Sequence, residues 1–148
     1  MTRVGFIGLG SQGASMARRI TEESFPLTVW ARRRVTTDAF ADTAAVVAST
    51  PADLGAASDI VGLCVVADTD VEDILLRPDG VLAGMSPGGV VAIHSTIHPD
   101  TCLRLADEAA KREVSVVDAP VSGGGGAAAQ RRLLVMAGGQ EADVAGSW

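Results

Sequence analysis

Apolar residues along this chain gather in short, uninterrupted runs. Runs of this kind, rich in Val, Ile and Leu and bounded by glycine, proline or charged residues, predict β-strands. The predicted strands are residues 4–7, 27–31, 44–48, 59–66, 89–93, 114–118 and 133–137. The run "DIVGLCVV" at 59–66 shows no alternation of polar and apolar positions, which is typical of a strand buried on both faces of a sheet.

Between these runs, apolar and small residues recur at helical spacing. The predicted helices are residues 11–22, 69–76 and 99–112, with a fourth that begins at Pro51 behind the cap-like Thr50. The helix at 99–112 is expected to bury one stripe, formed by Cys102, Leu105, Ala106, Ala109 and Ala110. Strands that alternate with helices favour right-handed βαβ units. The pattern therefore predicts one α/β domain over residues 1–148, with a doubly wound, mostly parallel sheet and helices on both faces.

Composition fits a folded globular chain. Of its 148 residues, 47% are hydrophobic and 20% charged, and the mean hydropathy is +0.28. The longest apolar run, residues 60–67, is too short to cross a bilayer, and the N-terminal "MTRVGFIGLG" lacks the cleavage site of a secretory signal. Cys64 and Cys102 are a lone pair without CxxC spacing, which suits a reducing compartment. We therefore expect a cytoplasmic protein without a membrane partner.

Charge narrows the possible partners further. The formal net charge is −6, and the only basic cluster is Arg32, Arg33 and Arg34. Nucleic-acid-binding proteins usually present a broad basic face, so we do not expect nucleic acid as a partner. No metal-ligand spacing is evident, and His94 is interpreted as a structural residue at a strand end. We expect no metal site.

The first chemical motif is "GLGSQG", a GxGxxG that follows a predicted strand and opens a predicted helix. In this setting the first glycine permits a tight turn, the second lets the backbone approach a pyrophosphate, and the third lets helix and strand pack closely. The helix N-terminus then faces the anion. The motif predicts a Rossmann-like dinucleotide site at Gly8, Leu9, Gly10, Ser11, Gln12 and Gly13. The alternative is an ordinary turn rich in glycine.

The end of the second predicted strand bears on which dinucleotide binds. An NAD-preferring site usually places Asp or Glu there, where the carboxylate accepts hydrogen bonds from the ribose hydroxyls. This strand ends "VWARRR". Arg32 and Arg33 would neutralise a 2′-phosphate and bind it through paired N–H groups, so the sequence favours NADP over NAD. In the alternative interpretation, the arginines simply solvate a turn.

Four blocks, in order along the chain, resemble the N-terminal domain of the β-hydroxyacid dehydrogenases. They are "VGFIGLGSQGASMARRI", "CVVADTDVEDIL", "HSTIHPDTCLRLA" and "DAPVSGGGGAAAQRRLLVMAGG". The family includes 3-hydroxyisobutyrate dehydrogenase and is related to 6-phosphogluconate dehydrogenase. The resemblance implies an NAD(P)-dependent oxidoreductase that transfers hydride between nicotinamide and a small hydroxyacid or semialdehyde. It also implies that the full-length protein forms a homo-oligomer.

The resemblance also implies roles for individual residues. Val65, Val66 and Asp70 would line the nicotinamide half of the cofactor site, and Thr96 would contact the nicotinamide or its ribose. The substrate carboxylate would be held by Ser122, Gly123 and Gly124. Glycine N–H groups converge readily on an anion, although Ser-Gly-Gly is also common turn chemistry.

The chain departs from the family pattern at three places. Gln12 replaces the usual Met of the fingerprint, so a polar side chain there is expected to meet cofactor or water. Arg131 and Arg132 fall where the family has Gly and Thr or Ser, and arginine would be strained if that glycine needs a positive φ. The family's catalytic lysine belongs to a segment that would lie beyond Trp148, so we expect no catalytic residue in this chain. The single lysine here, Lys111, belongs to a predicted surface helix.

Three functions therefore compete. The first is an NADP-dependent dehydrogenase or reductase, represented by its cofactor domain without the catalytic lysine and the helical C-terminal domain. The second is a non-catalytic dinucleotide-binding module, and the third is a purely structural α/β domain. Proton transfer is typically worth about 10² to 10⁴ in rate. We therefore predict that these 148 residues bind the cofactor but turn over substrate very slowly, if at all.

Overall fold

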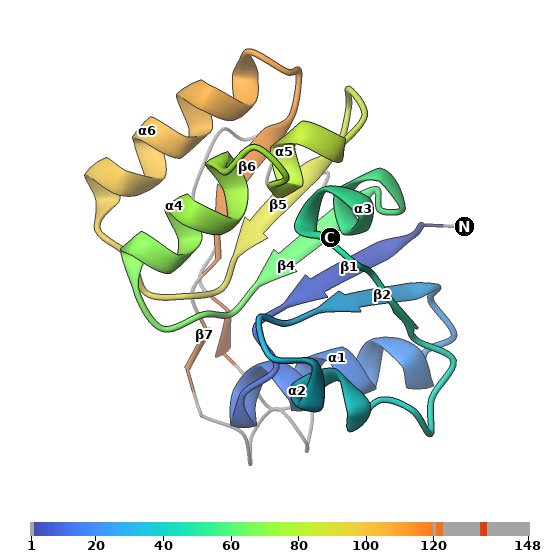
Figure 1. Ribbon diagram of the computed structural model, residues 1–148. Helices are drawn as coiled ribbons and strands as arrows, with labels where there is room; N and C mark the ends of the chain where they lie inside the picture. Colours follow the sequence, from blue (N-terminus) through green and yellow to red (C-terminus); the bar gives the residue numbers. More distant parts are fainter. Residues whose placement is uncertain (1, 120, 123–133, 136–148) are drawn as a thin grey trace.

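Six parallel strands form one sheet in the order β3-β2-β1-β4-β5-β6 (Figure 1). The computed structural model describes residues 2–119, 121–122 and 134–135. The strands are β1 (Val4–Ile7), β2 (Leu27–Trp30), β3 (Val46–Val47), β4 (Ile60–Leu63), β5 (Val90–Ile93) and β6 (Ser115–Asp118). Every neighbouring pair is parallel, so all the strands end at the same edge of the sheet. The predicted doubly wound parallel sheet is confirmed.

Helices cover both faces of this sheet. They are α1 (Ser11–Glu22), α2 (Arg34–Asp38), α3 (Pro51–Ala56), α4 (Asp68–Leu76), α5 (Val81–Gly84) and α6 (Pro99–Ala110). Figure 1 shows α1 and α2 on one face and α3, α4, α5 and α6 on the other. No helix of the described residues is long and apolar enough to span a membrane.

Two hydrophobic clusters divide the core between the faces. The larger joins the sheet to α3 through α6 and includes Leu63, Val71 and Leu105, all fully buried. The smaller joins β1 and β2 to α1 through residues such as Phe6 and Ala17. The larger cluster is almost wholly aliphatic, whereas the smaller one also contains Phe6 and Phe40, and the burial of these apolar side chains supplies most of the stability of such a fold.

Most predicted element bounds agree with the structure to within a few residues. The helix at 11–22 is reproduced as α1, and Thr50 caps α3 by accepting a 3.1 Å hydrogen bond from the amide of Asp53. Strand β4 ends at Leu63, earlier than the predicted 66, because the chain turns out of the sheet there toward α4. The short helices α2 and α5 have too few residues to show a helical period.

The predicted buried stripe of α6 is partly wrong. Leu105 and Ala109 are buried, but Ala110 is exposed because the helix ends there. Thr101 is buried instead, and its side chain hydrogen-bonds the carboxylate of Asp68. The spacing of apolar residues does not predict the burial of a hydroxyl whose hydrogen-bond partner belongs to another helix.

A separate two-stranded antiparallel sheet pairs β7 (Val121–Ser122) with β8 (Leu134–Val135). The predicted strand at 133–137 is therefore present at residues 134–135, although it does not join the parallel sheet. Residues 133, 136 and 137 lie outside the described part of the chain.

The order of the strands reverses beside β1. From β1 the chain moves outward through β2 and β3, and then it returns to the other side of β1 and moves outward through β4, β5 and β6. The carboxyl ends of β1 and β4 therefore flank a topological switch point, where open α/β sheets bind their ligands.

Candidate functional site

The predicted cofactor residues gather at the carboxyl edge of the sheet. They lie in the segments that follow β1, β2, β4 and β5, four strands that are adjacent in the sheet. Segments far apart in the sequence are thus brought to one edge, around the switch point (Figure 1).

The turn at residues 8–13, hereafter the glycine turn, is held by close backbone contacts. Gly8 has a φ of +97°, and a Cβ placed on it would lie 2.1 Å from the carbonyl oxygen of Cys64. A Cβ on Gly13 would lie 1.8 Å from the carbonyl oxygen of Gly8. Both distances are far below normal contact, so only glycine fits at either position.

Gly10 differs from the other two glycines. Its φ is −70°, which any residue adopts, and a Cβ placed on it would meet no atom within 4 Å. The fold therefore does not require glycine here. The open space beside its backbone is what a ligand that approaches the main chain needs.

The other residues of the glycine turn have two different surroundings, the core and the N-terminus of α1. Leu9 is 8% exposed and packs in the smaller core cluster, so its side chain points away from the site. Gly10 caps α1 without a side-chain hydrogen bond, and Ser11 begins the helix. The buried Nε2 atom of Gln12 has no hydrogen-bond partner among the described residues. An uncapped helix N-terminus beside an unpaired amide donor suits an anionic ligand.

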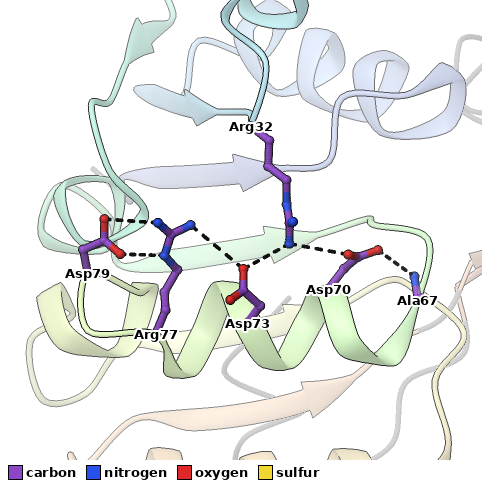
Figure 2. Close-up of polar contacts among 6 residues, drawn as sticks. All are labelled: Arg32, Ala67, Asp70, Asp73, Arg77 and Asp79. Atoms are coloured by element: carbon purple, nitrogen blue, oxygen red, sulfur yellow. Dashed lines mark hydrogen bonds and ion pairs between the residues drawn. The ribbon is translucent and has the colours of Figure 1, made fainter.

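Arg32 follows β2 and reaches across to α4 (Figure 2). Its Nη2 atom lies 3.1 Å from Oδ2 of Asp73 and 3.4 Å from Oδ1 of Asp70. Asp70 also accepts a 3.3 Å hydrogen bond from the amide of Ala67 through its Oδ2 atom. We call Arg32, Asp70 and Asp73 the charged corner. Both acids come from α4, so the pattern at the end of β2 could not reveal them.

The ion pairs extend beyond the charged corner along α4 and its C-terminal end. Arg77 lies 4.0 Å from Asp73 and makes a 2.6 Å contact with Asp79, as Figure 2 also shows. Arg33 is exposed and stands at the N-cap of α2, and in the described part of the chain it makes no ion pair. The two arginines predicted to bind one phosphate thus have different surroundings.

The loop after β4 is fixed by a serine that the sequence did not indicate. The amide of Val65 donates a 2.8 Å hydrogen bond to Oγ of Ser95, which is buried. Val66, the next residue, is 94% exposed, and Thr96 is also exposed. Ser95 therefore links the loops after β4 and β5, while Val66 and Thr96 remain accessible to a ligand.

His94 is structural in this fold. Its Nδ1 atom lies 2.9 Å from the carbonyl oxygen of Ala119, and its ring stacks on Phe6 with the centroids 6.1 Å apart. Burial lowers the pKa of this imidazole, so the ring is neutral and Nδ1 donates to the carbonyl. Burial raises the pKa of the Asp118 carboxyl at the end of β6.

The thiols show no sign of activation. Burial raises the pKa of both Cys64 and Cys102, and the charge of Asp118 adds to the effect on Cys102. A thiol with a raised pKa is a poor nucleophile at neutral pH. Among the residues that the structure describes, no cluster of His, Cys, Asp and Glu could hold a metal ion.

The structure describes only part of the predicted substrate-carboxylate site. Ser122 belongs to β7, but its side chain is not described. Gly123, Gly124, Arg131 and Arg132 lie outside the described residues. Their predicted roles and conformations therefore stay predictions.

The same holds for the catalytic lysine of the family, which the resemblance implies would lie beyond Trp148. Trp148 itself lies outside the described residues, so the structure does not test this expectation. Lys111, the one lysine of the chain, follows the C-terminal end of α6 and pairs with Glu108 at 2.9 Å. Because α6 runs away from the carboxyl edge, Lys111 lies far from the glycine turn and is not placed to act there.

The comparisons with known proteins converge on one family. Residues 3–146 match the family described as the NAD binding domain of 6-phosphogluconate dehydrogenase. The chain is 38% identical over 143 residues to "Probable 3-hydroxyisobutyrate dehydrogenase-like 2, mitochondrial" of Arabidopsis thaliana, a match that covers 97% of this chain and 48% of that protein. The chain thus spans about half the length of the curated relatives it matches.

Solved structures agree. Mycobacterium tuberculosis 3-hydroxyisobutyrate dehydrogenase with L-serine superposes with a TM-score of 0.92 at 25% identity, covering 99% of this chain and 50% of that one. Psf3 in complex with NADP+ and 2-OPP superposes with a TM-score of 0.88 at 32% identity, covering 94% and 49%.

Proposed function

The chain belongs to the family of NAD-binding domains of the 3-hydroxyisobutyrate dehydrogenase and 6-phosphogluconate dehydrogenase type, and we propose that within this family it binds NADP in preference to NAD. The proposed role is that of the cofactor domain of an oxidoreductase acting on a small hydroxyacid or semialdehyde. This role combines the glycine turn, which serves any dinucleotide, with Arg32 and Arg33, which serve a 2′-phosphate.

The observation that carries the proposal is the contrast among the three glycines of the turn. Gly8 and Gly13 are required by backbone contacts, whereas Gly10 faces open space. A pyrophosphate needs such an opening at the N-terminus of a helix, where N–H groups and the helix dipole favour an anion. A turn with a purely structural role would not need a third glycine at this position.

Preference for NADP rests on charge at the end of β2. No acid follows β2 directly, and Arg32 and Arg33 stand after this strand, where the adenosine ribose would bind. A 2′-phosphate would gain charge-assisted hydrogen bonds from these guanidinium groups. Psf3, which is 32% identical, was solved in complex with NADP+, and this supports NADP as a ligand here.

The proposed chemistry is hydride transfer, for which a bound nicotinamide supplies the hydride donor or acceptor. The protein's own contribution in this domain is to bind and orient. The loop held by Ser95 would position the nicotinamide half of the site, with Val66 and Thr96 accessible to it. The residue that transfers the proton is proposed to be a lysine outside these 148 residues, so the chain alone should bind cofactor with little turnover.

The test is titration calorimetry of the chain with NADP+ and NAD+ separately. We expect a saturable heat for both dinucleotides and a smaller dissociation constant for NADP+. Tighter binding of NAD+ would overturn the preference and leave dinucleotide binding intact. Absence of binding for both dinucleotides would overturn the function itself. Turnover by the chain alone, at rates ordinary for an enzyme, would contradict the proposed division of labour.

A further inference from the structure

Arg32 is not free to serve a phosphate with its full charge. Two carboxylates of α4 share its Nη2 atom, at 3.1 Å from Asp73 and 3.4 Å from Asp70. Figure 2 shows this nitrogen between the two acids, both of which come from α4. The N–H groups on Nε and Nη1 lie outside these two contacts, so the guanidinium keeps donors for a ligand while its charge is largely neutralised.

The surrounding charges increase this effect. Arg32 and Arg77 face three carboxylates, those of Asp70, Asp73 and Asp79. Among these five groups the negative charges exceed the positive ones by one, so Arg33, which makes no ion pair in the described part of the chain, is left as the neighbouring guanidinium with its full charge. The side chain of Arg32 is 53% exposed, so these interactions are partly screened by solvent and fall as salt is added.

We propose that Asp70 and Asp73 are specificity-determining residues that weaken the preference for a 2′-phosphate and let the site accept NAD as well as NADP. This rests on the proposed dinucleotide function. From α4, the two carboxylates contact the guanidinium that follows β2, the strand that ends with an acid in NAD-preferring sites. These carboxylates repel a 2′-phosphate and can accept hydrogen bonds from the unphosphorylated ribose.

The proposal also concerns which half of the cofactor Asp70 serves. The family resemblance implies the nicotinamide half, but the contact with Arg32 favours the adenosine half. Asp73 should have the larger effect, because its contact with Nη2 is shorter and is a hydrogen bond, whereas Asp70 also binds the amide of Ala67.

The experiment measures the dissociation constants of NADP+ and NAD+ for Asp73→Asn, Asp70→Asn and the double variant. Asparagine keeps the size of the side chain and, at position 70, an oxygen for the amide of Ala67. Asp73→Asn should tighten the binding of NADP+ about fivefold, Asp70→Asn about twofold and the double variant about tenfold, as expected for charges near a solvent-exposed pair. Binding of NAD+ should be unchanged or weaker, and the gain for NADP+ should shrink at high salt.

Glu108→Gln is the matched control. It removes one carboxylate from an exposed ion pair, that with Lys111, at the far end of α6 from the site. It changes the net charge equally and should leave the ratio of the two dissociation constants unaltered. Thermal unfolding of every variant verifies that the fold is kept.

The outcomes separate this inference from the function on which it rests. An unchanged ratio in the double variant, or weaker NADP+ binding, would overturn the role of the acids, while wild-type binding of either dinucleotide would preserve the proposed function. A shift of the same size in Glu108→Gln would also overturn it, since net charge alone would then explain the effect.

Discussion

The glycine turn and the charged corner lie at the same edge of the sheet, but different forces hold them together. In the turn, backbone atoms approach so closely that a single Cβ at Gly13 would lie 1.8 Å from a carbonyl oxygen. In the charged corner, exposed side chains meet through charge, which water and salt screen. The first region should decide whether a dinucleotide binds, and the second should decide which one.

The largest expected effect comes from Gly13→Ala. The added methyl group must displace the backbone of Gly8, and overpacking of backbone against backbone has no soft side chain to absorb it. We expect the free energy of unfolding to fall by more than about 3 kcal/mol. Urea unfolding followed by circular dichroism measures this change. Loss of less than about 1 kcal/mol would show that steric contact does not hold the turn.

Gly10→Ala should give the opposite result within the same turn. Its Cβ meets no atom within 4 Å, so the free energy of unfolding should change by no more than about 1 kcal/mol, the cost of alanine at an N-cap. Dinucleotide binding should weaken about 100-fold or more, because the methyl group occupies the approach of the pyrophosphate. Calorimetry on this variant measures the dissociation constants of NADP+ and NAD+. Wild-type affinity for both would disprove the proposed site.

Removing the cation of the charged corner should have a smaller and selective effect. Arg32→Gln should weaken the binding of NADP+ about tenfold, because one charge-assisted contact to the 2′-phosphate is lost. The binding of NAD+ should change little. Stability should change by less than about 0.5 kcal/mol, as is usual for an exposed ion pair. Lys111→Gln, which also removes one exposed cation, is the control for net charge. Equal weakening of both dinucleotides would place Arg32 outside the ribose site.

The smallest effect concerns pH and His94, whose ring stacks on Phe6 of β1. Its pKa is lowered below the ordinary 6.5, so the unfolded chain takes up a proton before the folded chain does. Stability should therefore decline as the pH falls below about 6.5. At lower pH the carboxyls of Asp59 and Asp68, whose pKa values are lowered from 3.8, add a loss in the same direction. Urea unfolding at a series of pH values measures this decline.

His94→Asn should flatten that decline, because the amide keeps a donor for the carbonyl of Ala119 but does not titrate. The raised pKa of Asp118 acts in the other direction, since its folded form binds a proton more readily as pH falls. An undiminished slope between pH 7 and about pH 5 in the variant would assign the effect to another group.

The two regions also differ in how far the sequence reveals them. The glycine turn is local, and the spacing of its glycines predicted both the start of α1 and the opening at Gly10. The charged corner depends on a contact between the end of β2 and α4, which follows β4, and β1 separates those strands in the sheet. Charge patterns along a chain do not encode such distant pairings, so the sequence indicated Arg32 and Asp70 as site residues without their contact and without Asp73.

Ser95 and Leu9 illustrate the same limit at single residues. The motif "HSTI" drew attention to Thr96, yet the buried hydroxyl that holds the amide of Val65 belongs to Ser95. Leu9 falls within the fingerprint, but its side chain turns into the core. A motif indicates which segment forms a site, whereas the direction of each side chain depends on how the neighbouring strands pack.

The contact between Gly13 and the carbonyl of Gly8 has a consequence for the evolution of such a domain. A side chain at position 13 would clash with main-chain atoms, and a second substitution elsewhere does not remove main-chain atoms. Position 13 should therefore stay glycine as the sequence evolves. The acids of α4 are replaceable one at a time, with effects that neighbouring charges can offset. Single substitutions at these acids would therefore be enough to change which dinucleotide the domain prefers during evolution. Binding of either dinucleotide would still depend on glycine at both positions 8 and 13.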